Sequence, residues 1–223
     1  MGLNISKGNM YEFVTHTWNA IKGKCFHDCS YCYMKRWGNL KDVRLDKKEL
    51  KTDLGSGNFI FVGSSNDIFA ENIPKDWTRS VLSHCSVYSG NKYLFQTKNP
   101  YRVGEFVLPD NSILCTTIET NRYYPEIMGN SPKPIDRVLA FSNRPYSKFV
   151  TIEPILDFDL EHMVDLMKHV NPEQINIGAD SGNNKLPEPE KDKVLKLIKE
   201  LSGNAIIVKK KNLSRIFEKK ETK

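Results

Sequence analysis

The sequence contains no long hydrophobic run and few cysteines. No stretch of about eighteen apolar residues is present, so nothing is expected to span a membrane. Residues 1–10 lack the continuous apolar core of a secretory signal, and the expected compartment is therefore the cytoplasm. The five cysteines are an odd number, and three of them fall within eight residues. That distribution argues against a disulfide framework and favours a metal site in a reducing compartment.

Internal repeats and low-complexity linkers are also missing. The 223 residues, of which 39% are hydrophobic, suffice for a sizeable core, and we expect a single domain over residues 1–223. The formal net charge is +6, and a basic tail at about residues 209–223 supplies much of it. A basic surface favours polyanions such as nucleic acid, but a solvated lysine-rich surface explains so modest an excess at least as well.

Short apolar runs rich in β-branched residues recur along the chain, with polar or amphipathic segments between them. Such runs are typical of strands buried on both faces of a parallel sheet. The expected strands are residues 59–62, 93–96, 112–116, 149–152, 174–177 and 205–208, with an earlier candidate at 11–14. Helical spacing predicts helices within 157–170 and 188–201, and a third candidate is 77–85. This alternation predicts an α/β fold, a partial (open) parallel β/α barrel of about six to seven strands, too few for a closed eight-stranded barrel.

Polar residues follow almost every expected strand. In parallel barrels the C-terminal strand ends form the active site, so convergence of polar ends predicts a site for a charged ligand. The candidates at these ends are Gly63, Ser64, Ser65, Lys98, Glu119, Glu153 and Asp180. A buried glutamate needs a partner, for which Lys98 is a candidate through a structural ion pair. Ordinary strand-end turns are the competing explanation for Gly63, its two serines and Asp180.

Cys25, Cys29 and Cys32 are spaced C-x3-C-x2-C on one short loop at about residues 23–34. Three thiolates can each take one iron of a cubane cluster, whereas the usual cubane has four cysteine ligands. The remaining iron then keeps an open position, as catalytic metals require. Structural zinc with His27 as fourth ligand remains an alternative, although zinc sites usually include a second, distant ligand pair. Three unrelated core cysteines are a further alternative.

This cysteine spacing, with Tyr31 before the last cysteine, resembles the signature of the radical S-adenosylmethionine (SAM) superfamily. More narrowly, the chain resembles an uncharacterised radical SAM family found in phages and bacteria, and more distantly the spore photoproduct lyases, which repair DNA with the same cofactors. Asp180 stands where that phage and bacterial family leads us to expect Glu. The segments that carry the narrower resemblance are residues 17–19, 61–69, 95–100, 149–156 and 177–182.

The resemblance implies a cytoplasmic enzyme that holds a 4Fe–4S cluster on the three cysteines and cleaves SAM reductively to a 5′-deoxyadenosyl radical. It implies that Tyr31 lies near the adenine of SAM, and that the strand-end candidates listed above bind this cofactor. A flavodoxin- or ferredoxin-like protein is the expected electron donor. Nucleic acid or a nucleotide is our first expectation for the substrate, with Lys209 a candidate for contacting its phosphate. The alternatives are a zinc-stabilised nucleic-acid-binding protein without catalysis and a cluster protein that only transfers electrons.

Overall fold

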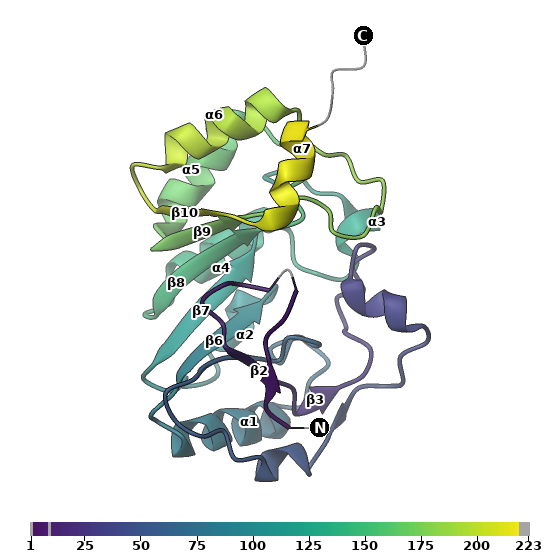
Figure 1. Ribbon diagram of the computed structural model, residues 1–223, viewed down its shortest axis with the longest axis vertical. Coiled ribbons are helices and arrows are strands. Elements are labelled where there is room, and N and C mark those ends of the chain that lie inside the picture. Colours follow the sequence, from purple (N-terminus) through teal and green to yellow (C-terminus); the bar gives the residue numbers. More distant parts are fainter. Residues whose placement is uncertain (1, 9, 219–223) are drawn as a thin grey trace.

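The computed structural model describes residues 2–8 and 10–218, and a mostly parallel sheet organises them (Figure 1). The main sheet is made of β1 (Asn4–Ile5), β2 (His16–Trp18), β5 (Phe59–Val62), β6 (Lys92–Thr97), β7 (Ser112–Thr117), β8 (Ser147–Ile152), β9 (Gln174–Ile177) and β10 (Ile206–Lys209). A second, two-stranded sheet pairs β3 (Ile21–Lys22) with β4 (Arg44–Leu45) and lies beside the loop of the clustered cysteines.

The spatial order of the main sheet is β1-β2-β5-β6-β7-β8-β9-β10. Within the described part of this sheet β1 pairs antiparallel with β2, and every other pair of neighbouring strands runs parallel. Among the described residues β1 and β10 are the two edges and do not pair with each other. The expected open parallel barrel is therefore confirmed.

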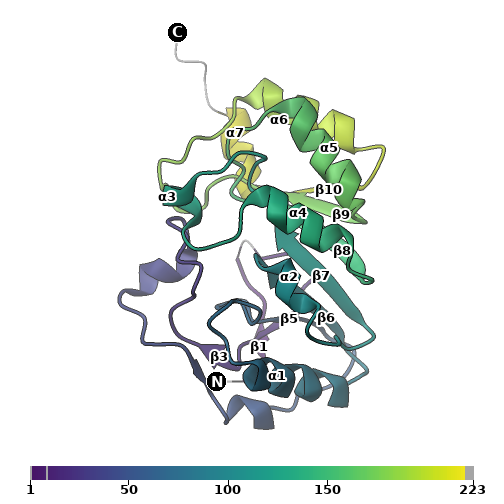
Figure 2. The same ribbon diagram turned by 180° about the vertical axis from the view of Figure 1, so that it is seen from behind.

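Helices between the parallel strands cover one face of this sheet, and Figure 2 shows α1, α2, α4, α5 and α6 along it. The α-helices are α1 (Lys75–Val87), α2 (Pro100–Val103), α3 (Pro125–Met128), α4 (Pro134–Ser142), α5 (Leu160–Val170), α6 (Lys191–Leu201) and α7 (Ser214–Glu218). The 3-10 helices are η1 (Tyr33–Trp37), η2 (Glu49–Lys51) and η3 (Lys211–Leu213). No helix in the described part of the chain is long and apolar enough to cross a membrane.

Alternation along the strands divides the sheet into two faces with different chemistry. On β6, Tyr93 and Phe95 join the large core under the helices, whereas Leu94 points to the opposite, concave face. Leu94 packs there in an apolar layer whose other buried members are Tyr11, Val14, Phe61, Cys115 and Phe149. Nearer the C-terminal strand ends the concave face becomes polar, beginning with Gln96 and Thr117. The apolar layer thus forms the floor beneath a polar site.

The N-terminal segment corrects one expectation. Residues 11–14 form a turn, in which the Val14 amide donates to the Tyr11 carbonyl at 3.0 Å, and not a strand. The short apolar run suggested a strand, but Tyr11 and Val14, three positions apart, are both buried in the concave apolar layer, which fits a turn better. The first parallel strand is instead β2, which begins at His16. Of the predicted basic tail, residues 219–223 lie outside the described residues.

Candidate active site

Three cysteines, the loop after β5 and the ends of β6 to β10 surround one cavity of about 480 Å³. Nearly all the sequence-predicted site residues line it, and they are Cys25, Cys29, Tyr31, Cys32, Gly63, Ser64, Ser65, Lys98, Glu153 and Asp180. Glu119 is not among the lining residues. The parallel topology explains this convergence, because it brings the C-terminal ends of successive strands to the same edge.

The cysteine loop is held against α3 and its flanking residues. The Ser30 amide donates to the Ile127 carbonyl at 2.9 Å, and the Cys32 amide donates to the Cys29 carbonyl at 3.1 Å. Gly129, at φ +58°, allows the loop to approach this closely, because a Cβ there would lie 2.2 Å from the His27 carbonyl oxygen. None of the five cysteines is in a disulfide.

Burial raises the pKa of the Cys25 thiol to about 12, with a further contribution from the nearby charge of Asp67. Burial also raises the pKa of Cys32. Metal ligation requires thiolates, so a metal bound here would have to offset the cost of ionising these buried sulfurs. Three clustered, disulfide-free thiols are a donor set of the kind that iron–sulfur clusters use.

The position of His27 bears on the zinc interpretation. Within the described residues no group of three or more His, Cys, Asp or Glu side chains is placed to hold a metal, whether as a zinc ion or as an iron–sulfur cluster. His27, the suggested fourth zinc ligand, directs its Nε2 to the Asp67 carboxylate at 2.7 Å. The geometry therefore gives the zinc interpretation no support.

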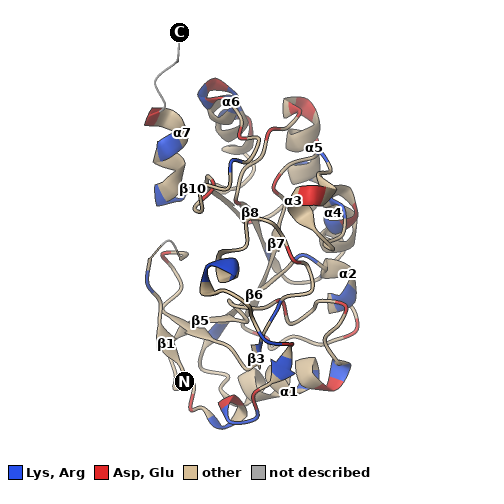
Figure 3. Cartoon of the chain, turned by 90° about the vertical axis from the view of Figure 1, so that its right-hand side faces the viewer, with Lys and Arg blue, Asp and Glu red and all other residues tan. Residues whose placement is uncertain are grey.

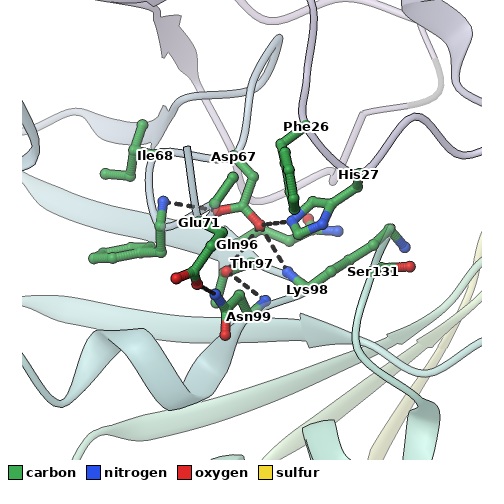
Figure 4. Close-up of polar contacts among 12 residues, drawn as sticks. Phe26, His27, Asp67, Ile68, Glu71, Gln96, Thr97, Lys98, Asn99 and Ser131 are labelled. Carbon is green, nitrogen blue, oxygen red and sulfur yellow. Dashed lines mark hydrogen bonds and ion pairs between the residues drawn. The ribbon is translucent and has the colours of Figure 1, made fainter. Parts of the chain in front are cut away.

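Asp67 connects the cysteine loop to the sheet, as Figure 4 shows. Its Oδ2 accepts hydrogen bonds from His27, from the Thr97 hydroxyl at 2.8 Å and from the Lys98 amide at 2.9 Å. Its Oδ1 accepts one from the Phe69 amide at 2.9 Å. Burial alone would raise the pKa of Asp67, but His27 and the two amides outweigh it and hold the pKa below its usual value. A permanent carboxylate thus fixes the loop to the ends of β5 and β6.

The turn after β5 is shaped by one glycine and one asparagine. Gly63 has φ +77°, and a Cβ on it would lie 2.8 Å from the Asn66 carbonyl oxygen and the Ile68 side chain. The Asn19 Oδ1 accepts from both the amide and the hydroxyl of Ser65 at 2.9 Å, and its Nδ2 donates to the Ser64 hydroxyl at 3.1 Å. Asn19 was not a predicted site residue, although it belongs to the segment 17–19 that carries the resemblance.

Glu119 is fully buried behind the cavity and holds two of its lining residues. Lys98 Nζ donates to Oε1 at 2.7 Å, Tyr31 donates to the same oxygen, and Arg137 Nη1 donates to Oε2 at 2.7 Å. Burial would raise the pKa of Glu119, but Arg137 and then Lys98 outweigh it and lower that pKa to about 2. The suggested Lys98–Glu119 ion pair is present. Glu119 therefore contacts the cavity through Lys98 and Tyr31.

Glu153 differs from Glu119, because its side chain lines the cavity. Lys210 Nζ donates to its Oε2 at 2.5 Å, and Asn212 Nδ2 donates to its Oε1 at 2.8 Å. Gly178 leaves the space for this contact, since a Cβ there would lie 2.8 Å from the Glu153 carboxylate. The basic residue at this site is Lys210 and not Lys209, which is exposed at the end of β10.

Asp180 lines the cavity and also closes a local turn. Its carboxylate accepts from the Gly182 amide at 2.9 Å and from the Asn184 side chain at 2.7 Å. Tyr11, which the sequence interpretation assigned to a strand, donates to Gln96 Oε1 at 2.7 Å on the cavity floor. Gln96 in turn donates to the Thr117 hydroxyl at 3.0 Å. The polarity of these strand-end residues was the only sequence signal for this chain of hydrogen bonds.

Comparison with protein families matches residues 9–204 to the family described as protein of unknown function DUF5131. No curated protein matches the sequence. A tyrosine-to-phenylalanine variant of spore photoproduct lyase is similar in structure, with a TM-score of 0.64 and 10% identity over 92% of this chain and 80% of that one. Another variant of that enzyme, with bound AdoMet and dinucleoside spore photoproduct, has a TM-score of 0.56 and 11% identity over 91% of this chain. This chain spans 66% of the length of that variant. At such low identities the likeness establishes the fold alone, an open parallel β/α barrel like that of these lyases.

Proposed function

The chain belongs to the DUF5131 family, and we propose that it is a radical SAM enzyme that acts on nucleic acid or a nucleotide. The observation that carries this proposal is the meeting of three disulfide-free cysteines, spaced C-x3-C-x2-C, with a glycine–serine turn and an ion-paired glutamate around one cavity. That cavity lies at the C-terminal ends of parallel strands, where barrels of this kind carry out chemistry.

In this proposal Cys25, Cys29 and Cys32 hold a 4Fe–4S cluster. When bound, the cluster supplies the electron that cleaves SAM to methionine and a 5′-deoxyadenosyl radical, which takes a hydrogen atom from the substrate. Asp67 and His27 orient the loop that carries these cysteines, through their 2.7 Å hydrogen bond. The concave apolar layer beneath the cavity limits the access of water to reactive species.

The residues opposite the cysteines suit the polar parts of SAM. The Ser64 and Ser65 hydroxyls, oriented by Asn19, can accept from an ammonium group. Glu153, already neutralised by Lys210, can accept from ribose hydroxyls. We assign Tyr31 to the adenine, Lys98 and Asp180 to the polar rim, and Glu119 to positioning Lys98 and Tyr31.

The substrate assignment draws on charge and on likeness. The chain is basic, with a pI of about 8.9. A structural neighbour is a spore photoproduct lyase with a bound dinucleoside. A flavodoxin- or ferredoxin-like protein is the electron donor that we propose. We also propose that residues 1–223 form a single domain that works in the cytoplasm. The family to which we assign the chain is one found in phages and bacteria.

The test uses anaerobically purified protein reconstituted with iron and sulfide. The reduced protein is given SAM, and 5′-deoxyadenosine is measured by mass spectrometry together with bound iron. The Cys29→Ala variant should lose nucleoside production and cluster iron. Cys85→Ala is the matched control, because Cys85 is also buried but lies in α1, away from the cavity.

Nucleoside from the parent and the Cys85 control, but not from the Cys29 variant, would support the proposal. A brown protein whose spectrum ignores SAM would indicate electron transfer instead. A colourless protein with one bound zinc ion would rule the enzyme out, if that zinc is retained in Cys85→Ala and lost in Cys29→Ala.

A further inference from the structure

The short helix η1 exposes an aromatic side chain beside the candidate active site. It begins directly after Cys32, and its residues Tyr33, Met34 and Arg36 line the cavity. Trp37, its last residue, is 75% exposed. The other two tryptophans differ, because Trp18 is fully buried and Trp77 is partly buried. Trp37 is not among the residues that line the cavity, but it directly follows Arg36, which does. Tryptophan is enriched among the residues that dominate binding surfaces.

This helix is fixed to the protein, so the exposure of Trp37 is not the result of a loose segment. The Tyr33 hydroxyl donates to the Ser64 carbonyl at 2.8 Å. Arg36 Nη2 donates to the Ser181 carbonyl at 2.6 Å, across the cavity mouth. Lys35 pairs with Asp28 at 3.0 Å. These contacts hold the Trp37 backbone at a defined place relative to the cavity.

The charge around η1 is strongly basic. Residues 22–51 contain nine Lys or Arg and four Asp or Glu, a net of five positive charges against +6 for the chain. Figure 3, viewed from the right-hand side of Figure 1, shows basic residues on η1 and on α7. From α7, Arg215 donates to the Asp180 carbonyl at 3.1 Å, next to the Ser181 carbonyl that Arg36 contacts. Arginines from both segments therefore lie at the same rim, where Arg215 is also ion-paired with Glu188.

Aromatic and basic side chains interleaved at a cavity mouth suit single-stranded nucleic acid. Bases stack on exposed aromatic rings, and arginine and lysine neutralise the phosphates. A base paired within a duplex offers no free face to Trp37, and a cavity of about 480 Å³ has room for a nucleotide rather than a helix. An acidic protein would also be attracted by the charge, but it would not require a free aromatic ring.

We propose that η1 is a stacking platform for single-stranded nucleic acid, with an unpaired base on Trp37 and the adjoining phosphate on Arg36. The strand then enters the cavity between η1 and α7. This inference deepens the proposed function. It rests on that function in one respect, because the bound strand is the substrate only if the protein is the enzyme that we propose. Binding itself needs neither SAM nor an electron, so it can be tested separately.

The test measures fluorescence anisotropy of a labelled oligothymidylate of about sixteen nucleotides, with the purified full chain, before and after cluster reconstitution. Trp37→Ala should weaken binding by about fivefold or more, and Trp37→Phe should restore most of it. Tyr101→Ala is the matched control, because Tyr101 is 76% exposed but lies on α2 on the helix-covered face. Arg36→Gln should reduce the slope of log affinity against log salt by about 0.7, as expected for one lost phosphate contact to a single strand.

Tryptophan fluorescence and heparin complete the design. The oligonucleotide should quench the emission of Trp37, whereas heparin, a polyanion without bases, should bind without that quenching. Equal binding by parent and Trp37→Ala would overturn the inference, and so would quenching that persists in the variant. If Trp37→Ala changes neither the oligonucleotide affinity nor the heparin affinity, the surface is a general basic one. Tighter binding of a duplex than of the single strand would also contradict the stacking platform. None of these outcomes depends on whether SAM is cleaved.

Discussion

Replacing the buried carboxylate of Glu119 tests how much its ion pairs contribute to the free energy of unfolding. Replacing it in the Glu119→Gln variant preserves its shape but leaves the fully buried Arg137 without its ion-pair partner. Breaking one side of a buried pair costs about 3–5 kcal/mol of unfolding free energy, because an uncompensated charge remains in the interior. A protein of this kind is stable by about 5–15 kcal/mol, so the loss is large. Urea denaturation at pH 7 measures it directly.

The same carboxylate predicts a pH dependence. Its pKa is about 2 in the folded protein against an ordinary value of 4.5, a difference worth about 3 kcal/mol. Because the folded pKa is depressed, this stabilisation is complete above pH 4.5 and is lost as the pH falls towards 2. The stability difference between parent and Glu119→Gln should therefore shrink by about 2 kcal/mol between pH 7 and pH 3.

An exposed ion pair provides the control. Asp76 and Arg79 on α1 pair at 2.9 Å, with side chains 88% and 58% exposed. Asp76→Asn should cost at most about 0.5 kcal/mol, since water and salt screen such pairs. If Glu119→Gln costs no more than Asp76→Asn, or if its effect is the same at pH 3 and pH 7, the Glu119 network does not stabilise the fold as we argue.

Three further changes test individual parts of the site. Gly63→Ala should destabilise the protein by about 1 kcal/mol or more, because φ is +77° and the new Cβ meets backbone at 2.8 Å; thermal unfolding measures this, and an unchanged Tm would contradict it. Asp67→Asn should lower the iron bound after reconstitution without preventing folding, since it weakens the link between the cysteine loop and the sheet; iron content equal to that of the parent would argue against this role. Lys210→Met should weaken SAM binding in calorimetry, because it leaves Glu153 with one cationic partner fewer, whereas Lys209→Met should have no effect, and equal effects of the two would reject the assignment.

Strands that are buried on both faces could be predicted from sequence almost residue by residue. The runs at Phe59–Val62 and Gln174–Ile177 are β5 and β9 with the same limits, because continuous apolar β-branched residues suit a two-sided environment. β2 escaped prediction because its three residues include only one apolar side chain, Trp18. α4 was missed because its apolar pattern is interrupted by Arg137, whose burial depends on Glu119 and on the carbonyls of Thr117 and Pro132.

The residues that line the site could be predicted from the topology of the sheet. The hydrogen bonds between side chains that are far apart in the sequence could not. Polar strand ends predicted the lining residues because parallel strands share one edge. No local signal indicated that Asn19 would orient the serines 45 and 46 positions later. The basic side chain beside Glu153 is Lys210, one residue beyond the Lys209 that the sequence suggested, and in an extended segment neighbouring side chains point to opposite faces.

Two glutamates at equivalent strand ends show why the surroundings decide the role. Glu119 follows β7 and meets a buried arginine, so its charge is permanently compensated and its oxygens are occupied by Arg137, Lys98 and Tyr31. Glu153 follows β8 and lines the cavity, and its cationic partner Lys210 directly follows the edge strand β10 and lies 4.7 Å from the centre of the Tyr11 ring. A ligand can reach Glu153 without unpairing a buried charge, whereas contact with Glu119 would require displacing one. The carboxylate beside β8 is therefore the one that a polar cofactor can contact, and the carboxylate beside β7 keeps the surrounding side chains in place.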